Sequence, residues 1–331
     1  MKNLEPIFSA SNLSIGFKQD RQRIQVLSGL NFSFYQGECI CLMGENGSGK
    51  STLIKTLAAL IRPLDGDVLL NGKPLSKFST QTLSRFISVV LTEKPFIENF
   101  KVHETVALGR FPYTNWLGKL DEEDERVIEE ALALTGLTKL KEKNIGEVSD
   151  GERQKVMIAR ALAQQTPVIL LDEPTTHLDL PSRIEIVSLL RSLCDKHGKT
   201  IVFSCHELDL ALHSATKCML VGSTVHYGLP EELILNGHIS KAFDRNDIEF
   251  SLSKGYFVKK SAPKGYFYIN GVEIPAKWTQ NALEREGFQY LEDASVRVNC
   301  EQNKWRVFYD GGHADFTNLS DLLDHVKSLN L

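Results

Sequence analysis

The chain has 331 residues, of which 42% are apolar and 24% are charged, and its formal net charge is −4. This length suits one large α/β domain with a second, smaller one, and the composition is that of a globular protein rather than a disordered or fibrous one. Acidic and basic residues are interspersed, so the chain lacks the basic field that holds a nucleic acid, and we expect no nucleic-acid partner.

The six cysteines and the N-terminal residues indicate a reduced, cytosolic chain. No two cysteines have the C-x-x-C spacing of zinc or redox sites. The first residues lack the apolar run of a secretion signal, and no stretch approaches the roughly 18 uninterrupted apolar residues of a spanning helix. We therefore expect any role at a membrane to come through a partner.

The first predicted elements are strands. Alternating apolar residues predict an antiparallel β region from Ile7 to Gly37. The apolar run Glu38 to Met43, a glycine-rich loop and helical spacing from Ser51 to Leu60 predict a strand, a loop and a helix in succession. After a strand near Ile87 to Leu91 the chain becomes mainly helical, with an acidic-fronted amphipathic helix from Asp121 to Leu134.

The following part alternates helices with short, continuously apolar strands, which is typical of a buried parallel sheet. The expected elements are helix Glu152–Ala163, strand Val168–Leu171, helix Ser182–Cys194, strand Thr200–Ser204 and helix Glu207–Ala215.

The glycine-rich loop fits the pattern G-x-x-x-x-G-K-[ST] between a strand and a helix. Glycines let backbone N–H groups close around phosphate oxygens, while Lys50 reaches the β- and γ-phosphates and Ser51 offers its hydroxyl to Mg²⁺. The alternative is a glycine-rich turn without a ligand. The predicted nucleotide-binding residues are Gly44, Glu45, Asn46, Gly47, Ser48, Gly49, Lys50, Ser51 and Thr52.

Two carboxylates end an apolar strand, which a buried strand has no structural reason to do. Asp172 is predicted to hold Mg²⁺, and the adjacent Glu173 to orient or deprotonate the water that attacks the γ-phosphate. The alternative is that one of them only caps the following helix.

A short helix earlier, Val148-Ser149-Asp150-Gly151-Glu152 resembles the L-S-G-G-Q signature of the ABC ATPases, and Ser149 with Gly151 keeps the family's residues. The other three positions, Val148, Asp150 and Glu152, depart from that pattern. The same residues also form a capping box that would start any helix, and both roles are compatible. The resemblance covers about residues 7–258.

Further positions follow from this resemblance. It implies a D-loop that includes Asp179, a catalytic histidine at His206, an adenine-contacting aromatic at Phe17, and Glu93 where the family has a magnesium-contacting glutamine. Taken alone, His206 is more often structural in such a position and Phe17 more often a core residue. Glu93 adds a negative charge near the γ-phosphate, which should alter affinity.

The segment from Val102 to Tyr113 resembles the ATPases of importers for iron–siderophore complexes, haem and cobalamin. Aromatic residues concentrate at interfaces, so this stretch is a candidate docking patch, although half of its aromatics could be core. The patch comprises Phe96, Phe100, Phe111, Tyr113 and Trp116.

We therefore predict an α/β P-loop NTPase of the ABC ATPase type over residues 1–258. It would have a parallel-sheet core, an antiparallel β subdomain and a helical insert at about 94–165. The resemblance implies a homodimer that binds ATP and Mg²⁺ and works peripherally on the cytoplasmic face of the inner membrane. Its partners would be integral-membrane permease subunits and, indirectly, a solute-binding protein.

Several alternatives stay open. They are a soluble ABC ATPase of translation or DNA repair, an importer ATPase for another small solute, a P-loop kinase or GTPase, and a regulatory protein that binds ATP but hardly hydrolyses it.

The sequence of residues 259–331 predicts a small α+β module whose role is unknown. It is either a stabilising appendage or a regulatory or dimerising module. Asn270-Gly271 predicts the turn of a hairpin from Gly265 to Ile274, and Thr279 is the expected N-cap of a helix that Gly287 ends. Trp278 and Leu283 would form its hydrophobic staple. Two strands, Ser295–Cys300 and Lys304–Tyr309, and a closing helix capped by Asn318 should follow.

Overall fold

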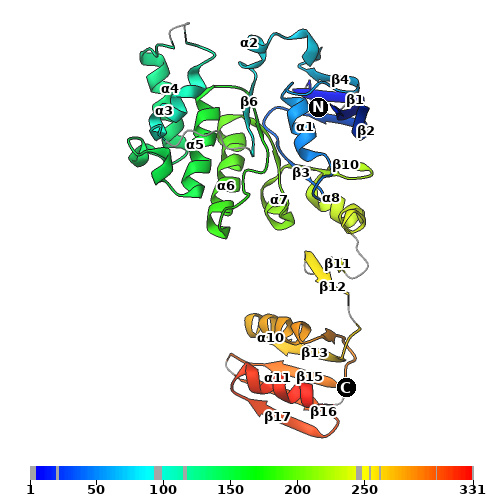
Figure 1. Cartoon of the computed structure of the whole chain (residues 1–331). Coiled ribbons are helices and arrows are strands. Elements are labelled where there is room, and N and C mark those ends of the chain that lie inside the picture. The colour runs from blue at the N-terminus through cyan, green and yellow to red at the C-terminus, as the bar shows by residue number, and fades with distance from the viewer. Residues whose placement is uncertain are drawn as a thin grey trace. The chain divides into compact units, whose positions relative to one another are not determined.

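The computed structural model describes residues 5–19, 22–92, 99–114, 118–243, 248–252, 255–260, 262–302 and 304–329. The chain divides into two compact units, of which the first comprises residues 1–244 and 250–257 and the second residues 245–249 and 258–331. Figure 1 labels many of their elements.

The centre of the first unit is a six-stranded sheet in the order β10-β9-β3-β8-β7-β6, parallel except for the pair of β9 with β10. Its strands are β3 Cys39–Met43, β6 Ile87–Val90, β7 Val168–Leu171, β8 Thr200–Ser204, β9 Lys217–Val221 and β10 Val225–Gly228.

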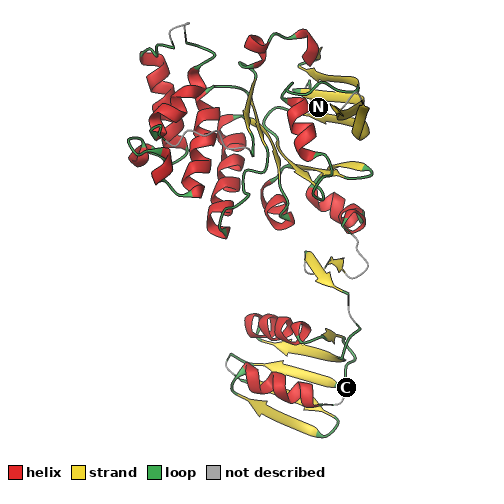
Figure 2. Ribbon diagram, viewed as in Figure 1, coloured by secondary structure: helices red, strands yellow, loops and turns green. Residues whose placement is uncertain are grey.

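Both faces of this sheet are covered, which explains the continuously apolar strands. Along β3, Cys39 and Cys41 belong to one hydrophobic core, while Ile40 and Leu42 belong to the other. The helices around the sheet are α1 Lys50–Leu57, α5 Asp150–Ala163, α6 Leu180–His197, α7 Leu208–Ser214, α8 Pro230–Leu235 and α9 His238–Ala242 (Figure 2). The predicted α/β core is therefore confirmed.

A second, antiparallel sheet has the strand order β2-β1-β4-β5. Its strands β1 and β2 precede α1 in the chain, and β4 and β5 follow it. Strands β1 Phe8–Gln19 and β2 Gln22–Phe34 lie in the predicted region. Strands β4 Asp65–Leu70 and β5 Lys73–Pro74 were not predicted, because Asp65-Gly66-Asp67 interrupts the apolar alternation.

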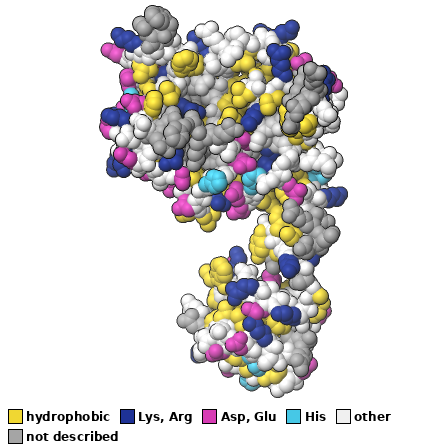
Figure 3. Space-filling model, in the orientation of Figure 1, with side chains coloured by type: hydrophobic (Ala, Val, Ile, Leu, Met, Phe, Trp, Pro, Cys, Tyr) yellow, Lys and Arg dark blue, Asp and Glu magenta, His cyan; other side chains and the backbone are white. Residues whose placement is uncertain are grey.

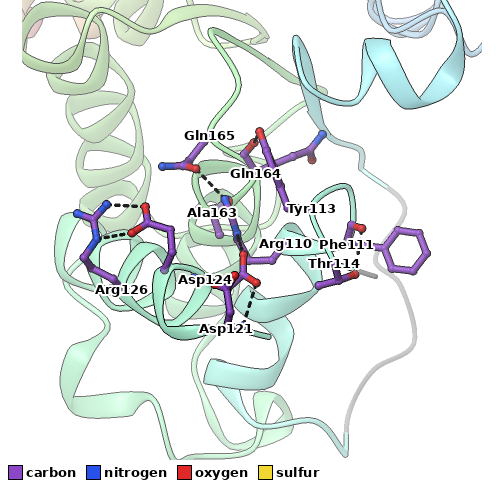
Figure 4. A network of polar contacts seen from close by, with 11 residues as sticks. Arg110, Phe111, Tyr113, Thr114, Asp121, Asp124, Arg126, Ala163, Gln164 and Gln165 are labelled. Atoms are coloured by element: carbon purple, nitrogen blue, oxygen red, sulfur yellow. Dashed lines mark hydrogen bonds and ion pairs between the residues drawn. The ribbon is translucent and has the colours of Figure 1, made fainter. Parts of the chain in front are cut away.

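Helix α2 Thr80–Leu83 precedes β6, and the helical part after β6 contains α3 Val102–Ala107, α4 Glu122–Leu134 and α5, which packs against both α3 and α4. A buried guanidinium holds it together. Arg110 donates to Asp124 Oδ1 at 2.7 Å, to the Ala163 carbonyl at 2.9 Å and to Gln165 Oε1 at 2.8 Å (Figure 4). The start of α4 is thereby tied to the end of α5.

Strands β11 Ile248–Ser251 and β12 Tyr256–Lys259 form a two-stranded sheet. Two of their residues that belong to the first unit, Phe250 and Phe257, have ring centroids 5.1 Å apart. Phe257 also meets Phe243 at 5.4 Å. Phe250 is buried in the core of this unit.

The second unit is a five-stranded sheet in the order β14-β13-β15-β16-β17 with two helices. The strands are β13 Gly265–Gly271, β14 Phe288–Tyr290, β15 Val296–Cys300, β16 Trp305–Tyr309 and β17 Gly312–Phe316, and the helices are α10 Glu273–Arg285 and α11 Leu319–Ser328. The predicted pair of strands and the Asn318 cap of the last helix are confirmed.

The predicted hairpin from Gly265 to Ile274 is wrong. Strand β13 continues through Asn270 to Gly271 and pairs in parallel with β14 and β15. A Cβ at Gly271 would lie 2.0 Å from the Cys300 carbonyl oxygen, so this glycine permits the close approach of β15 rather than a turn.

The predicted start of α10 is also wrong. Val272 is its N-cap, and Thr279 is buried within it, where its Oγ1 accepts a hydrogen bond from Trp305 Nε1 at 2.7 Å. Trp278 is 64% exposed and forms no staple with the buried Leu283. Gly287 follows the helix in the left-handed region, with φ +98°, as expected for a helix end.

Candidate active site

The predicted phosphate-binding loop, Gly44 to Ser51, connects the fully buried β3 to α1. Two of its glycines are required because a side chain would not fit. A Cβ at Gly44 would lie 2.1 Å from the Val221 carbonyl oxygen, and one at Gly49 would lie 2.7 Å from Val26 Cγ1. Gly49 is the N-cap of α1, with φ +106°. The Ser48 hydroxyl is buried without a hydrogen-bond partner in the described residues. Such an unsatisfied group at a helix N-terminus fits an anionic ligand.

Lys50 lies folded into this loop. Its Nζ donates to the carbonyl oxygens of Gly44 and Glu45, both at 2.9 Å, and the residue is 4% exposed. Burial lowers the pKa of Lys50, and the charges of Glu173 and Asp172 oppose that shift. Phosphate oxygens would offer this ammonium stronger, charged acceptors than the two carbonyls do.

Asp172 accepts two hydroxyl hydrogen bonds on one carboxylate oxygen. Ser51 Oγ and Ser204 Oγ each donate to Asp172 Oδ1 at 2.9 Å, and Asp172 is 4% exposed. A carboxylate beside a hydroxyl offers the oxygen ligands that Mg²⁺ prefers. The third predicted magnesium ligand, Glu93, lies outside the described residues.

Glu173 is held in place at its backbone and at both carboxylate oxygens. Its N–H donates to Ser204 Oγ at 2.8 Å, Oε1 lies 2.7 Å from His206 Nε2, and Oε2 accepts from Thr176 Oγ1 at 3.1 Å. Its φ is +50°, which is uncommon for a residue with a side chain and is found at functional sites.

Burial raises the pKa of Glu173. The hydrogen bond and charge of His206, together with Thr176 and Lys50, lower it by more than burial raises it, so the pKa of Glu173 lies below its ordinary value. The carboxylate is therefore ionised at neutral pH and able to accept a proton.

Ser149 and Gly151 lie at the N-terminus of α5. Ser149 Oγ accepts from the Glu152 N–H at 3.2 Å, and Glu152 Oε2 accepts from the Ser149 N–H at 2.8 Å, so the predicted capping box is present. Gly151 is buried against Ser182, near Asp179, which caps α6. In the described residues neither Ser149 nor Gly151 hydrogen-bonds to the phosphate-binding loop.

A cavity of about 570 Å³ adjoins the phosphate-binding loop and is lined by Glu45 to Ser48, Val26, Leu27 and residues 220–224. Asn46 lies in this lining, whereas Phe17 does not belong to it. Phe17 is 41% exposed on β1 opposite Ile24. Thr52 lies in the first turn of α1, where its carbonyl accepts from Thr56 Oγ1.

The predicted aromatic patch is only partly described, since Phe96 and Trp116 lie outside the described residues. Phe111 is 77% exposed and points away from the Arg110 network (Figure 4). Phe100 is also exposed, but Tyr113 is half-buried and its hydroxyl donates to the Gln164 carbonyl at 3.0 Å. Of the described members, two are free to dock and one supports the fold.

Sequence reasoning missed Ser204 and Thr176, which position the two carboxylates. A signal was present at Ser204, a hydroxyl that ends β8 after three apolar residues, beside the strand that Asp172 directly follows.

The ABC transporter family model matches residues 27–176. An uncharacterized ABC transporter ATP-binding protein of Methanocaldococcus jannaschii is 40% identical over 270 residues, which are 80% of this chain and 92% of that protein. This chain belongs to the ABC transporter ATP-binding proteins. It is therefore an ATP-binding ATPase, as predicted.

Other relatives of this ABC ATPase carry more specific names. The achromobactin transport ATP-binding protein of Dickeya dadantii is 39% identical over 66% of this chain and 82% of its own length. The iron(3+)-hydroxamate import ATP-binding protein of Bacillus subtilis is 41% identical over 61% of this chain and 74% of its own length. A second family model, the iron ABC transporter C-terminal domain, matches residues 264–327.

Solved structures agree with the fold of this ABC ATPase. A dimeric ATP-binding cassette bound to ADP and phosphate aligns with a TM-score of 0.58 and 26% identity, over 66% of this chain and 97% of that one. None of the helices in the described part of the chain has the length and apolar character of a membrane span.

Proposed function

We propose that this ABC ATPase energises the import of an iron complex, such as a siderophore or haem complex, or of cobalamin, through a separate membrane permease. The supporting observation is that one chain combines the ATP site around Glu173 with a segment that matches the iron ABC transporter C-terminal domain. The names of the relatives from Dickeya and Bacillus point in the same direction.

In this proposal Lys50 and the loop N–H groups bind the phosphates of ATP, and Phe17 contacts the adenine. Ser51 and Asp172 would hold Mg²⁺, which would neutralise phosphate charge when bound. Glu173 accepts a proton from the attacking water, while His206 and Thr176 fix the direction of its two oxygens. Ser204 keeps the two carboxylates in register.

We further propose a head-to-tail homodimer on the cytoplasmic face of the membrane. The signature residues Ser149 and Gly151 make no hydrogen bond to the loop of their own chain, and a helix N-terminus is suited to the γ-phosphate held by another copy. Asp179 would lie at the same junction.

Mixing subunits tests this arrangement. Lys50→Ala and Ser149→Arg chains are each expected to be inactive, but their heterodimer retains one site with an intact loop and an intact signature. ATPase activity should therefore recover partly on mixing. No recovery in demonstrated heterodimers would contradict head-to-tail pairing.

Capture from membranes tests the partner. Glu173→Gln should bind ATP without hydrolysing it, because the amide is nearly isosteric but cannot accept the proton. In the presence of ATP and Mg²⁺ this variant should retain a permease of an iron-complex or cobalamin importer. Recovery of a ribosome or a DNA-repair complex instead would favour a soluble ABC ATPase, and a permease for another solute would change the substrate.

A further inference from the structure

The second unit has one covered and one open sheet face. Both α10 and α11 pack on the same face, where a shared core contains Phe267, Val298 and Val307 of the sheet and Leu283 and Leu322 of the helices. Neither helix covers the opposite face. Figure 3 shows apolar side chains among charges of both signs on the visible surface of this unit.

The strand register arranges the open face in rows. One row crosses four strands as Tyr268, Arg297, Phe308 and His313, since each residue pairs with the next. The neighbouring row is Asn270, Asn299, Arg306 and Asp315. On β13, β15 and β16 these positions alternate with buried core residues, and on β17 they alternate with the partly buried Ala314 and Phe316.

The first row combines rings with a cation that lacks a carboxylate partner. The Arg297 guanidinium lies 5.5 Å from the Tyr268 ring centroid and forms no ion pair within the described residues. The Phe308 ring lies 6.0 Å from that of His313 and is 43% exposed. In the second row, Arg306 is paired with Asp315 at 2.6 and 2.9 Å.

These rows are complementary to themselves when reversed. Consider two such sheets stacked face to face and related by a two-fold axis that runs parallel to the strands, midway between β15 and β16. The axis reverses the order of the strands in the second sheet, but each residue keeps its position along the strand direction, so each row faces the same row of the other copy. Arg297 then faces Phe308 of the partner subunit, and Tyr268 faces His313 of the partner subunit. In the second row, Asn270 faces the partner subunit's Asp315, so no guanidinium is placed directly opposite another.

We infer that the open faces of two copies of this unit stack on each other about such an axis, as an isologous sheet-on-sheet interface. Cations over aromatic faces and amides against carboxylates supply the complementarity. The small size of the unit gives a reason for pairing, because units of about seventy residues bury little apolar surface alone. The interface does not involve ATP, so it is independent of the proposed import function.

Cross-linking of mixed single-cysteine chains tests the axis directly. All six native cysteines are buried, so an added exposed thiol reacts selectively. Full-length Tyr268→Cys and His313→Cys chains are mixed without nucleotide and treated with a bifunctional thiol reagent that spans about 10 Å, the spacing of stacked sheets. We expect a covalent heterodimer joining positions 268 and 313.

The controls separate this axis from other contacts. Either variant alone should cross-link poorly, because identical positions are offset sideways by three strand spacings, about 14 Å. Replacing His313→Cys with Ile274→Cys, an exposed site on α10, should also abolish the product. Absence of the 268–313 product, or equal yield from the single variants, would overturn the inferred axis.

Sedimentation of the nucleotide-free chain measures the affinity. Phe308→Lys places an ammonium against the partner's Arg297 and should weaken dimerisation about tenfold or more. The matched variant Ile274→Lys, which changes an equally apolar exposed residue outside this face, should not. A monomeric wild type, or equal effects of the two variants with their folds retained, would contradict the interface.

Discussion

Arg183 and Glu207 join two loops of the ATP site. Arg183 Nη1 donates to Glu207 Oε1 at 2.7 Å, and its Nε donates to the Leu178 carbonyl at 2.7 Å. Glu207 directly follows His206, and Leu178 directly precedes Asp179. One guanidinium thus connects the loop that carries the histidine beside Glu173 to the segment expected to meet the second copy.

Arg183→Ala should therefore impair hydrolysis more than ATP binding. Removing the guanidinium frees the loop after β8, so His206 holds Glu173 less well, while Lys50 and the phosphate-binding loop remain unchanged. We expect kcat to fall about tenfold, as for loss of a positioning contact, with ATP affinity nearly constant. Steady-state ATPase kinetics and direct nucleotide titration measure the two quantities.

Arg183→Lys is the matched control. It keeps the charge, but an ammonium cannot donate to the Leu178 carbonyl and the Glu207 carboxylate with the planar geometry of a guanidinium. It should recover part of the lost kcat. A parallel loss of kcat and ATP affinity in Arg183→Ala would instead indicate a general disturbance of the fold.

Ser204→Ala should reduce hydrolysis through both carboxylates. The hydroxyl donates to Asp172 and accepts from the Glu173 N–H, so its removal leaves a partly buried N–H without this acceptor. An unsatisfied group of this kind costs about 1–3 kcal/mol. We expect a lower kcat and a raised Mg²⁺ requirement, measured by ATPase assays across a magnesium titration. Ser204→Thr keeps the hydroxyl and should retain more activity, and equal loss in both variants would argue against the bridge.

His206 should set the acid limit of activity. Because the pKa of Glu173 is lowered in the folded chain, its carboxylate stays ionised, and active as a base, until the pH falls through that lowered value. His206→Ala removes the hydrogen bond and charge that lower the pKa, whereas burial, which raises it, remains. The acid limb of the kcat–pH profile should therefore move to higher pH, and a limb that stays in place would contradict this coupling.

The chain's strongest local patterns predicted the local structure of its candidate ATP site. The loop from Gly44 to Ser51, the carboxylates after β7 and the Ser149 cap depend on short stretches of sequence, and each is found as predicted in local structure. The link from Ser204 to Asp172 could not be predicted in this way. It arises from the register of two parallel strands 32 residues apart.

The errors in the second unit have the same origin. Asn270-Gly271 has the composition of a hairpin turn, but Gly271 is required by the approach of the Cys300 carbonyl from another strand. Thr279 is a residue type that is common at helix caps, but its hydroxyl instead accepts a hydrogen bond from Trp305 Nε1. At both positions a distant contact, invisible to local propensity, determines why that residue is present.

Arg110→Met should destabilise the helical part of the first unit. Arg110 and Asp124 are both buried, and removing one member of such a pair leaves an uncompensated charge, which costs about 3–5 kcal/mol. Arg126→Met is the matched control, because its partner Glu123 is exposed and its loss should change little (Figure 4). Urea unfolding measures the free energy of unfolding of the wild type and of both variants, and hydrogen exchange of the α4 amides locates the loss of stability.

The pH dependence of that difference identifies its cause. Burial raises the pKa of Asp124, but the Arg110 hydrogen bond and charge, with the bonds at Asp121, lower it overall. A carboxyl with a lowered folded pKa contributes stability above its unfolded pKa and loses that contribution as the pH falls through the folded value. In Arg110→Met burial remains and raises the pKa of the Asp124 carboxyl, so the folded variant takes up its proton at a higher pH than the unfolded chain does. The gap in unfolding free energy between wild type and Arg110→Met should therefore begin to narrow as the pH falls through that raised pKa, and narrow further below about pH 4, where the unfolded carboxyl begins to protonate. A gap that stays constant across this range would assign the loss to packing of the guanidinium on the Tyr113 ring, 4.0 Å away, rather than to the buried charge.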